Sequence, residues 1–191
     1  MRQITNAVLM VRPASFRKNE QTATNNFFQK EISNFSSQEI LAKVHKEFDD
    51  FVTLLRTNGI RVIVVQDTLK PDTPDAVFPN NWFTTHANGT VALYPMFAEN
   101  RREERNESVF DAIEEEGYLI NDILDYTEAE NEGLYLEGTG SIILDRVNKK
   151  AYCALSERAD IDLFIEFCED FDYHPIVFNA FQTVNNKRKL I

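Results

Sequence analysis

The segment 135–141 carries a carboxylate in a place where it could bind a cation. Its sequence is Tyr-Leu-Glu-Gly-Thr-Gly-Ser, so Glu137 follows apolar residues and precedes two glycines. Glycine has no side chain and lets another stretch of backbone or a ligand approach closely. Because burying a carboxylate is costly unless a positive charge meets it, Glu137 is a candidate ligand for a cationic group. A solvated turn residue is the alternative that this local pattern leaves open.

A second candidate segment, 74–86, reads Pro-Asp-Ala-Val-Phe-Pro-Asn-Asn-Trp-Phe-Thr-Thr-His. Its polar residues Asn80, Asn81 and His86 flank an apolar strand, and a rigid strand fixes such side chains well enough for chemistry. His86 is the one histidine that we would test, since His45 and His174 are expected to be structural. No Ser-His-Asp or Cys-His arrangement can be assembled from the sequence.

Four arginines form a second set of candidates: Arg101, Arg102, Arg105 and Arg158. The first three begin a helix expected over 101–116, where positive charge opposes the helix dipole. A residue in an unfavourable place suggests a use, namely capture of a substrate carboxylate by a guanidinium fork. Pairing with acidic residues of the same helix is an equally good alternative. Those acidic residues are Glu103, Glu104 and Glu107.

The two cysteines, Cys153 and Cys168, are expected to be buried free thiols in a reducing compartment. One falls in the middle of an expected strand and the other on the apolar face of an expected helix, whereas a reactive thiolate needs a partly exposed, electropositive position. Their spacing fits neither a disulfide framework nor a zinc site. We therefore expect no metal, and with no dinucleotide or phosphate-loop glycine motif, no cofactor.

Length and charge restrict the classes of protein to which this chain can belong. With 191 residues, of which 43% are apolar, the chain is expected to form a single domain over residues 1–191. The 20 basic and 31 acidic residues give a net charge of −11, which argues against binding to nucleic acid or to an anionic membrane. No apolar run approaches the roughly 20 residues of a membrane span, and the first residues do not form a signal sequence. A cytoplasmic location is expected.

These candidate residues lie on a recurring order of elements. Two strands, 82–86 and 90–94, are joined through Asn88-Gly89, and the helix over 101–116 and a strand over 118–124 follow. The order recurs about 60 residues later. The elements of this second copy are strands 141–145 and 151–155, a helix over 160–171 with Ile161, Phe164, Ile165 and Cys168 on its buried stripe, and a strand over 174–180.

A less complete third copy comes first in the chain. A strand over 7–11 and a long polar loop over 14–35 precede a helix that begins with the capping box Ser36–Glu39 and ends at Asn58-Gly59. The side chains expected on its buried stripe are Ile40, Val44, Phe48, Phe51 and Leu55. An apolar strand over 60–65 completes the copy. Three ββαβ-like units predict an α/β fold, either an open sheet or blades of an α/β propeller, and the absence of nucleotide-binding motifs favours the propeller.

Four motifs in this order resemble those of the amidinotransferase and arginine deiminase group, the pentein superfamily. They are Phe-Pro-Asn-Asn-Trp-Phe-Thr-Thr-His at 78–86, Met-Phe-Ala-Glu-Asn-Arg-Arg-Glu-Glu-Arg at 96–105, Leu-Glu-Gly-Thr-Gly-Ser at 136–141 and Leu-Ser-Glu-Arg at 155–158. The sequence is most similar to the bacterial amidinotransferase-like proteins linked with citrulline utilisation. The resemblance implies a five-bladed α/β propeller of ββαβ modules, of which about three blades are present here.

The resemblance also implies roles for residues. Glu137 matches the carboxylate that binds the substrate guanidinium. Positions that hold the substrate's α-carboxylate are matched by Asn80, by Arg158 and by one arginine of the Arg101-Arg102 pair. The family's second guanidinium-binding carboxylate falls on His86, or on Asn81 in a shifted alignment. Neither residue is acidic, so a ureido or otherwise modified substrate would fit this charge better than free arginine.

The same resemblance implies a covalent mechanism that this sequence does not match. In the family a cysteine attacks the guanidinium carbon and a histidine of a later blade is the general acid–base. Neither has a counterpart here, and the segment 181–191 resembles a hairpin interrupted before the histidine motif. The expectation is the N-terminal part of a guanidino or ureido hydrolase that binds an arginine-like small molecule without turning it over. A non-catalytic binding or scaffold protein is the alternative, and a truncated product that forms a homo-oligomer through its open edge is a third.

Overall fold

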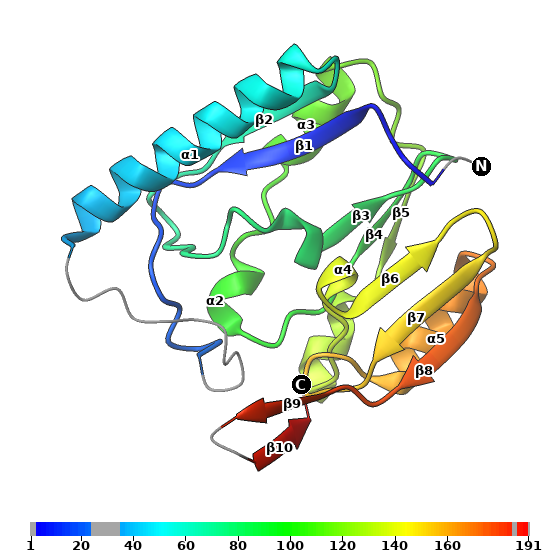
Figure 1. The fold of residues 1–191 in the computed structure, drawn as a ribbon. Helices are drawn as coiled ribbons and strands as arrows, with labels where there is room; N and C mark the ends of the chain where they lie inside the picture. The colour runs from blue at the N-terminus through cyan, green and yellow to red at the C-terminus, as the bar shows by residue number, and fades with distance from the viewer. Residues whose placement is uncertain (1–2, 24–34, 185–186, 191) are drawn as a thin grey trace. The chain divides into compact units, whose positions relative to one another are not determined.

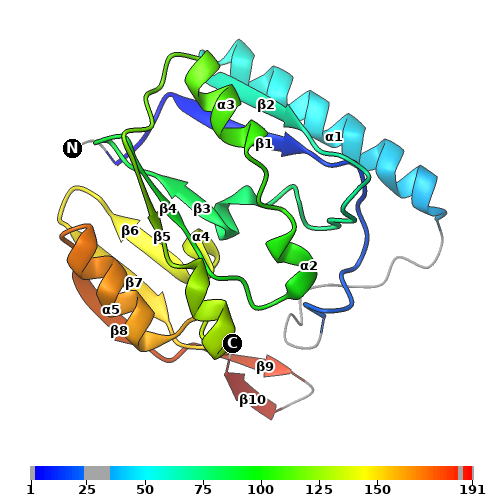
Figure 2. The ribbon, with the colours of Figure 1, turned by 180° about the vertical axis from the view of Figure 1, so that it is seen from behind.

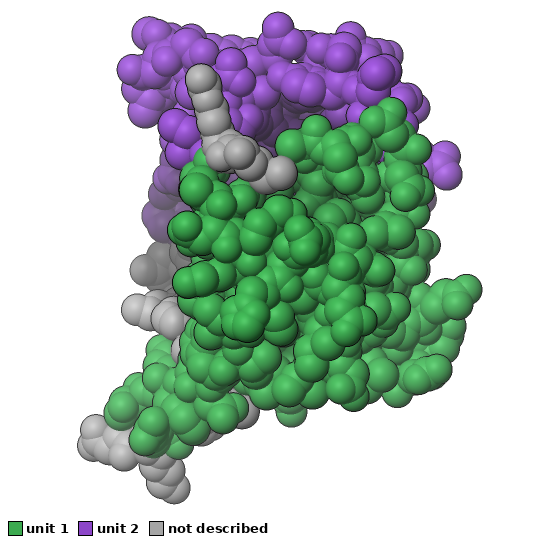
Figure 3. All heavy atoms as spheres, turned by 90° about the vertical axis from the view of Figure 1, so that its right-hand side faces the viewer, with its two compact units in different colours: residues 1–3, 80–98, 121–191 green, residues 4–79, 99–120 purple. Residues whose placement is uncertain are grey.

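A computed structural model describes residues 3–23, 35–184 and 187–190 as an α/β chain of short strands and helices (Figures 1 and 2). The chain divides into two compact units, coloured green and purple in Figure 3. Unit 1 comprises residues 1–3, 80–98 and 121–191, and unit 2 comprises residues 4–79 and 99–120. The single domain expected over residues 1–191 stays a prediction.

Unit 1 contains two three-stranded sheets with the same topology. In the first, β3 (Phe83–Thr85) pairs antiparallel with β4 (Thr90–Leu93), which pairs parallel with β5 (Asp122–Asp125). In the second, β6 (Ile142–Asp145), β7 (Lys150–Ala154) and β8 (His174–Phe178) pair in the same order and directions. The two predicted hairpins are therefore confirmed, each followed by a parallel strand. The strand expected over 118–124 begins later, at Asp122.

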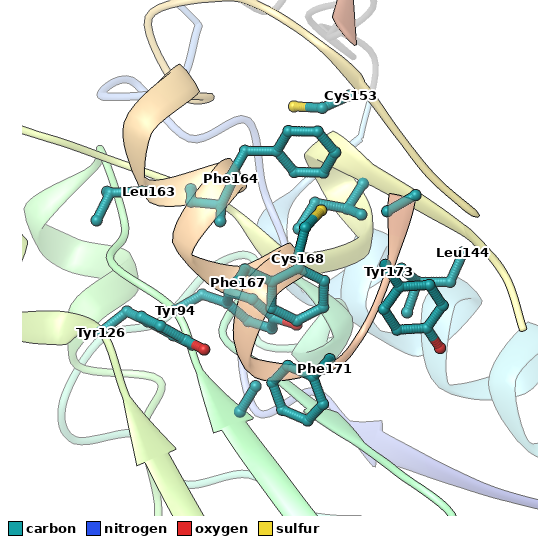
Figure 4. Close-up of a cluster of buried hydrophobic side chains, with 14 of the residues drawn as sticks. Tyr94, Tyr126, Leu144, Cys153, Leu163, Phe164, Phe167, Cys168, Phe171 and Tyr173 are labelled. Carbon is teal, nitrogen blue, oxygen red and sulfur yellow. The ribbon is translucent and has the colours of Figure 1, made fainter. Parts of the chain in front are cut away.

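The core of unit 1 is built around α5 (Ile161–Asp170), several of whose buried side chains are labelled in Figure 4. The Asp160 side chain caps the first turn of this helix. Phe164, Phe167 and Cys168 are buried among aromatic residues of the neighbouring elements. The expected stripe was wrong at Ile161 and Ile165, which are 41% and 37% exposed. The buried face instead includes Leu163 and Phe167, which belong to the same cluster as Phe164 and Cys168.

The helix expected over 101–116 is instead two helices, α2 (Glu99–Arg102) and α3 (Ser108–Glu115). Asn106 explains the interruption, because its side chain accepts a hydrogen bond from the Ser108 N–H at 3.0 Å and so begins a new helix. Both helices belong to unit 2, where α3 contacts β2 (Arg61–Gln66).

The other elements of unit 2 follow the predicted order. The strand β1 (Ala7–Arg12) pairs parallel with β2, and α1 (Ser37–Thr57) packs against this sheet, as Figure 1 shows. The capping box between Ser36 and Glu39 is confirmed, with both reciprocal hydrogen bonds present. Phe51 was wrongly placed on the buried stripe and is 50% exposed. Of the long loop 14–35, residues 24–34 lie outside the described residues.

Short elements complete the fold. They are the 3-10 helices η1 (Pro79–Asn81) and η2 (Thr127–Glu132), the helical turn α4 (Gly138–Ser141), and the strands β9 (Phe181–Val184) and β10 (Lys187–Leu190). The last two strands pair antiparallel, so the C-terminal segment expected as an interrupted hairpin is a two-stranded hairpin. Residues 185–186 between them lie outside the described residues. The sheets of the described chain thus contain two or three strands each.

Candidate functional site

Glu137 is a buried carboxylate in unit 1, only 1% exposed. Its Oε1 accepts a hydrogen bond from the backbone N–H of Phe97 at 3.2 Å, and its Oε2 accepts one from Asn81 Nδ2 at 3.2 Å. The guanidinium of Arg158 contributes a charged contact, with Nη1 3.4 Å from Oε2. A solvated turn residue, the alternative that the sequence left open, does not describe this environment.

Two glycines bring the turn after Glu137 against η1. Gly138 has φ +31°, and a Cβ built on it would lie 2.5 Å from the carbonyl oxygen of Asn80. A Cβ on Gly140 would lie 2.4 Å from Asn81 Nδ2. A Cβ at position 138 would therefore require backbone to move, and one at position 140 would displace the Asn81 amide that reaches the Glu137 carboxylate. The sequence indicated this close approach, although it did not say which segment approaches.

Asn80 and Asn81 have different partners in this turn. The Asn80 side chain donates to the hydroxyl of Thr139 at 3.0 Å, and that hydroxyl lies 3.3 Å from the Asn80 carbonyl oxygen, which can accept from it. Asn81 instead points its amide at Glu137. Asn81 is thus the member of the pair that contacts the carboxylate, and Asn80 fixes η1 to the glycine-containing turn.

The segment that follows β7 holds Arg158 beside Glu137. The Arg158 carbonyl oxygen accepts hydrogen bonds from the Glu137 N–H at 3.2 Å and from the Ser141 hydroxyl at 3.1 Å. Leu136 and Ala159 form an isolated β-bridge, which fixes the register of the two segments. The predicted residues Asn81, Glu137 and Arg158 are therefore brought together, although up to 77 positions separate them in the sequence.

His86 belongs to a different surrounding in unit 1. Its ring stacks on Phe171 with a centroid distance of 3.9 Å, its Nε2 lies 3.0 Å from the Thr84 hydroxyl, and Nδ1 faces Arg146 at 3.5 Å. Burial, with the positive charge of Arg146 next in weight, lowers the pKa of His86 to about 3. The three residues of β3, at a rise of roughly 3.3 Å each, separate His86 from η1 by on the order of 10 Å along the chain. Its neutral ring is a component of the core.

Arg101 and Arg102 lie in unit 2. Arg101 is 3% exposed, and its guanidinium donates to both carboxylate oxygens of Glu104, at 2.8 and 2.9 Å. It also donates to the carbonyl oxygen of Phe78 at 3.2 Å and lies 4.0 Å from Asp75. Of the two uses that the sequence left open for Arg101, pairing with Glu104 is the one observed. Arg102 is half-buried at the end of α2.

Sequence reasoning missed two contributors to these contacts. The Phe97 N–H holds Oε1 of Glu137, and a main-chain donor gives no signal in the residue types. Asn19 is completely buried in unit 2 and donates to Asp75 at 2.8 Å, in the part of the loop 14–35 that was expected only to be polar. An isolated Asn between Lys18 and Glu20 does not distinguish a buried anchor from a surface residue.

Both thiols are buried, as expected. Cys153 and Cys168 are buried free cysteines, and burial raises the pKa of Cys153 to about 12 and that of Cys168 to about 11.

Within residues 3–23, 35–184 and 187–190, no three His, Cys, Asp or Glu side chains are grouped so that they could hold a metal ion. In the same described parts, no helix has both the length and the apolar character that crossing a membrane requires.

Several solved structures are similar to this chain in fold. The N-terminal domain of ArgZ, a cyanobacterial arginine dihydrolase solved with its substrate, is similar with a TM-score of 0.63 and 18% identity over 94% of this chain. A complex of AgrE with ornithine and NAD+ gives a TM-score of 0.63 and 17% identity over 95% of the chain. DDAH from Pseudomonas aeruginosa, in complex with citrulline, gives 0.60 and 15% over 90%. These likenesses show a shared α/β fold with small sheets.

The chain spans only part of these structures. It covers 59% of the ArgZ domain, 24% of AgrE and 60% of the bacterial DDAH. A search of curated protein sequences finds no match.

The family follows from the sequence itself. The family described as N,N dimethylarginine dimethylhydrolase, eukaryotic, matches residues 12–191, which is nearly the whole chain. The protein therefore belongs to the dimethylarginine hydrolase family, within the pentein superfamily of guanidine-modifying enzymes, and the resemblance found in its motifs is confirmed. The description of this family names hydrolysis of dimethylarginine, a guanidino compound.

Proposed function

We propose that unit 1 carries the guanidine-binding part of a hydrolase site for guanidino or ureido amino acids, with Glu137 as the ligand of the substrate's planar nitrogen group. The observation that carries this proposal is the burial of a carboxylate beside a cation in a turn shaped by two glycines. Such a group is costly to bury, and pairing with a cation offsets that cost. Citrulline, the ligand named for one of the similar structures, is a ureido amino acid of this kind.

The hydrogen-bond capacity of Glu137 supports this role. An ionised carboxylate offers about four acceptor positions on its two oxygens. Phe97 and Asn81 occupy two of them with donors fixed by the backbone and by η1, and Arg158 occupies a third from a half-exposed segment. A guanidinium or ureido group therefore finds one position open and a second held only by Arg158. We propose Asn80 and Arg158 as partners of the substrate's carboxylate, whereas the role that the resemblance implies for Arg101 or Arg102, which belong to unit 2, stays a prediction.

We also propose that these 191 residues bind the substrate without converting it. Hydrolysis through a covalent adduct needs a thiolate and a histidine that exchanges protons near neutral pH. The raised pKa values of Cys153 and Cys168 and the lowered pKa of His86 support the absence of such a pair. The same observation favours the second candidate, a non-catalytic binding or scaffold protein of this fold. We propose further that the fold comprises about three of the five propeller blades and that the protein is located in the reducing cytoplasm.

The test is calorimetric titration of the full chain with arginine and citrulline, alongside an assay for released ammonia. Glu137→Gln removes the negative charge and keeps the shape, and we expect it to weaken arginine binding about 30-fold, which is ~2 kcal/mol. Glu132→Gln removes the same charge from an exposed position of unit 1 and should bind like the wild type. Equal affinity of wild type and Glu137→Gln would refute the proposed site, and ammonia release above background would refute binding without turnover.

A further inference from the structure

The cation that meets Glu137 in this structure is itself a guanidinium. Arg158 Nη1 lies 3.4 Å from Glu137 Oε2, and the two side chains are 28% and 1% exposed. Of the two substrate groups proposed for Glu137, a guanidinium has the same charge, planarity and N–H donors as the Arg158 head group. Both would use the same carboxylate oxygen, so they compete for it.

Only the side chain of Arg158 is free to leave. Its carbonyl oxygen is held by the Glu137 N–H and the Ser141 hydroxyl, and its N–H donates to the Ser156 hydroxyl at 3.3 Å. The head group, in contrast, makes one long contact to a single oxygen of Glu137. A single-point contact is weaker than the two-point arrangement that Arg101 makes with Glu104, where both oxygens are bound at 2.8 and 2.9 Å. Arg158 can therefore swing away while the backbone of the site stays in place.

We infer that Arg158 is a built-in competitor, which holds Glu137 in the empty protein and is displaced when a guanidinium ligand binds. This inference rests on the function proposed above. A ligand that also carries a carboxylate offers the displaced guanidinium a new partner, so every charge stays paired through the exchange. A guanidinium compound without a carboxylate leaves Arg158 unpaired. Arg158 thereby lowers the affinity of the site for plain guanidinium cations.

The size of the effect follows from the occupancy of the internal pair. If Arg158 occupies Glu137 in two-thirds to nine-tenths of empty molecules, a competing ligand binds roughly three- to tenfold more weakly than it would without Arg158. Arg158→Ala should therefore bind agmatine, a decarboxylated arginine, about three- to tenfold more tightly than the wild type. Arginine should gain less or lose affinity, because the same substitution removes the partner of its carboxylate.

The experiment is calorimetric titration of the full chain with agmatine and with arginine. Arg158→Gln, which keeps N–H donors without the charge, is a second variant in case Arg158→Ala fails to fold, and thermal unfolding checks both. Arg12→Ala is the matched control, because it also removes one guanidinium from a pair, the one with Asp49, and should leave both affinities unchanged. A rise in agmatine affinity with no matching rise for arginine is the expected result.

Two outcomes would overturn the inference, and they are distinguishable. If agmatine binds through Glu137 but no more tightly to either Arg158 variant, Arg158 does not compete for Glu137, so the inference fails and the proposed function stands. If agmatine and arginine bind to none of the proteins, or bind equally well to Glu137→Gln, the proposed function fails and the inference fails with it.

Discussion

Replacing Gly138 by alanine tests the geometry that holds η1 against the turn after Glu137 and so places Asn81 at its carboxylate. The added Cβ would lie 2.5 Å from the Asn80 carbonyl oxygen and 3.0 Å from both the Asn81 carbonyl oxygen and a ring carbon of Tyr94. Two of these three atoms belong to the backbone, so relief requires η1 or the turn to move. The positive φ adds a cost of about 1–2 kcal/mol for any residue with a side chain, and overpacking adds about 1–3 kcal/mol.

The matched control for this substitution is Gly117→Ala. Gly117 has φ +85° but no atom within 4 Å of a Cβ, so alanine there brings the backbone cost alone. Thermal and urea unfolding should show Gly138→Ala to be less stable than Gly117→Ala by about 1–3 kcal/mol, with about 2–4 °C in Tm for each kcal/mol. Titration with arginine should show a loss of binding for Gly138→Ala only. Equal stability and equal binding of the two variants would refute the close packing of this turn.

Two further predictions concern groups outside the proposed site. The pKa of His86 in the folded chain is about 3, whereas its ordinary value is near 6.5. Between these two pH values His86 binds a proton only in the unfolded chain. The free energy of unfolding should therefore fall by roughly 1.4 kcal/mol per pH unit from pH 6.5 downward, relative to His86→Gln. Urea titrations between pH 7 and 4.5 measure this difference, and parallel pH profiles of the two proteins would contradict it. Because burial raises the pKa values of Cys153 and Cys168 to about 12 and 11, a disulfide reagent at pH 8 should react at least about 100-fold more slowly with the folded chain than with the chain unfolded in denaturant. Rapid labelling of either cysteine in the folded protein would show that its thiol is accessible.

Much of the fold could be predicted because its signals are local. The capping box at Ser36 and Glu39 and the hairpin at Asn88-Gly89 depend on neighbouring residues, and both are found as expected. The errors arise where packing decides among similar local patterns. Ile165 and Phe167 are both apolar residues of α5, and the sequence alone does not show that the aromatic cluster is on the side of Phe167.

The candidate site was predictable in part for the same reason. The glycines after Glu137 indicated a close approach, but the approaching residue, Asn81, is 56 positions away in the sequence. The partner of Arg101 could not be predicted from the sequence. Its choice between a substrate carboxylate and Glu104 depends on side-chain geometry, and the structure shows the bidentate pair with Glu104. His86 was singled out by its position at a strand end, whereas its ring is part of the aromatic core.

The most direct test of the account is a crystal structure of this chain with arginine bound. We expect the ligand's guanidinium within hydrogen-bonding distance of the Glu137 carboxylate, with Asn81 and the Phe97 N–H still in contact and the Arg158 head group turned away toward the ligand's carboxylate. Density for arginine at another place, with the Glu137–Arg158 pair intact, would contradict the assignment of Glu137.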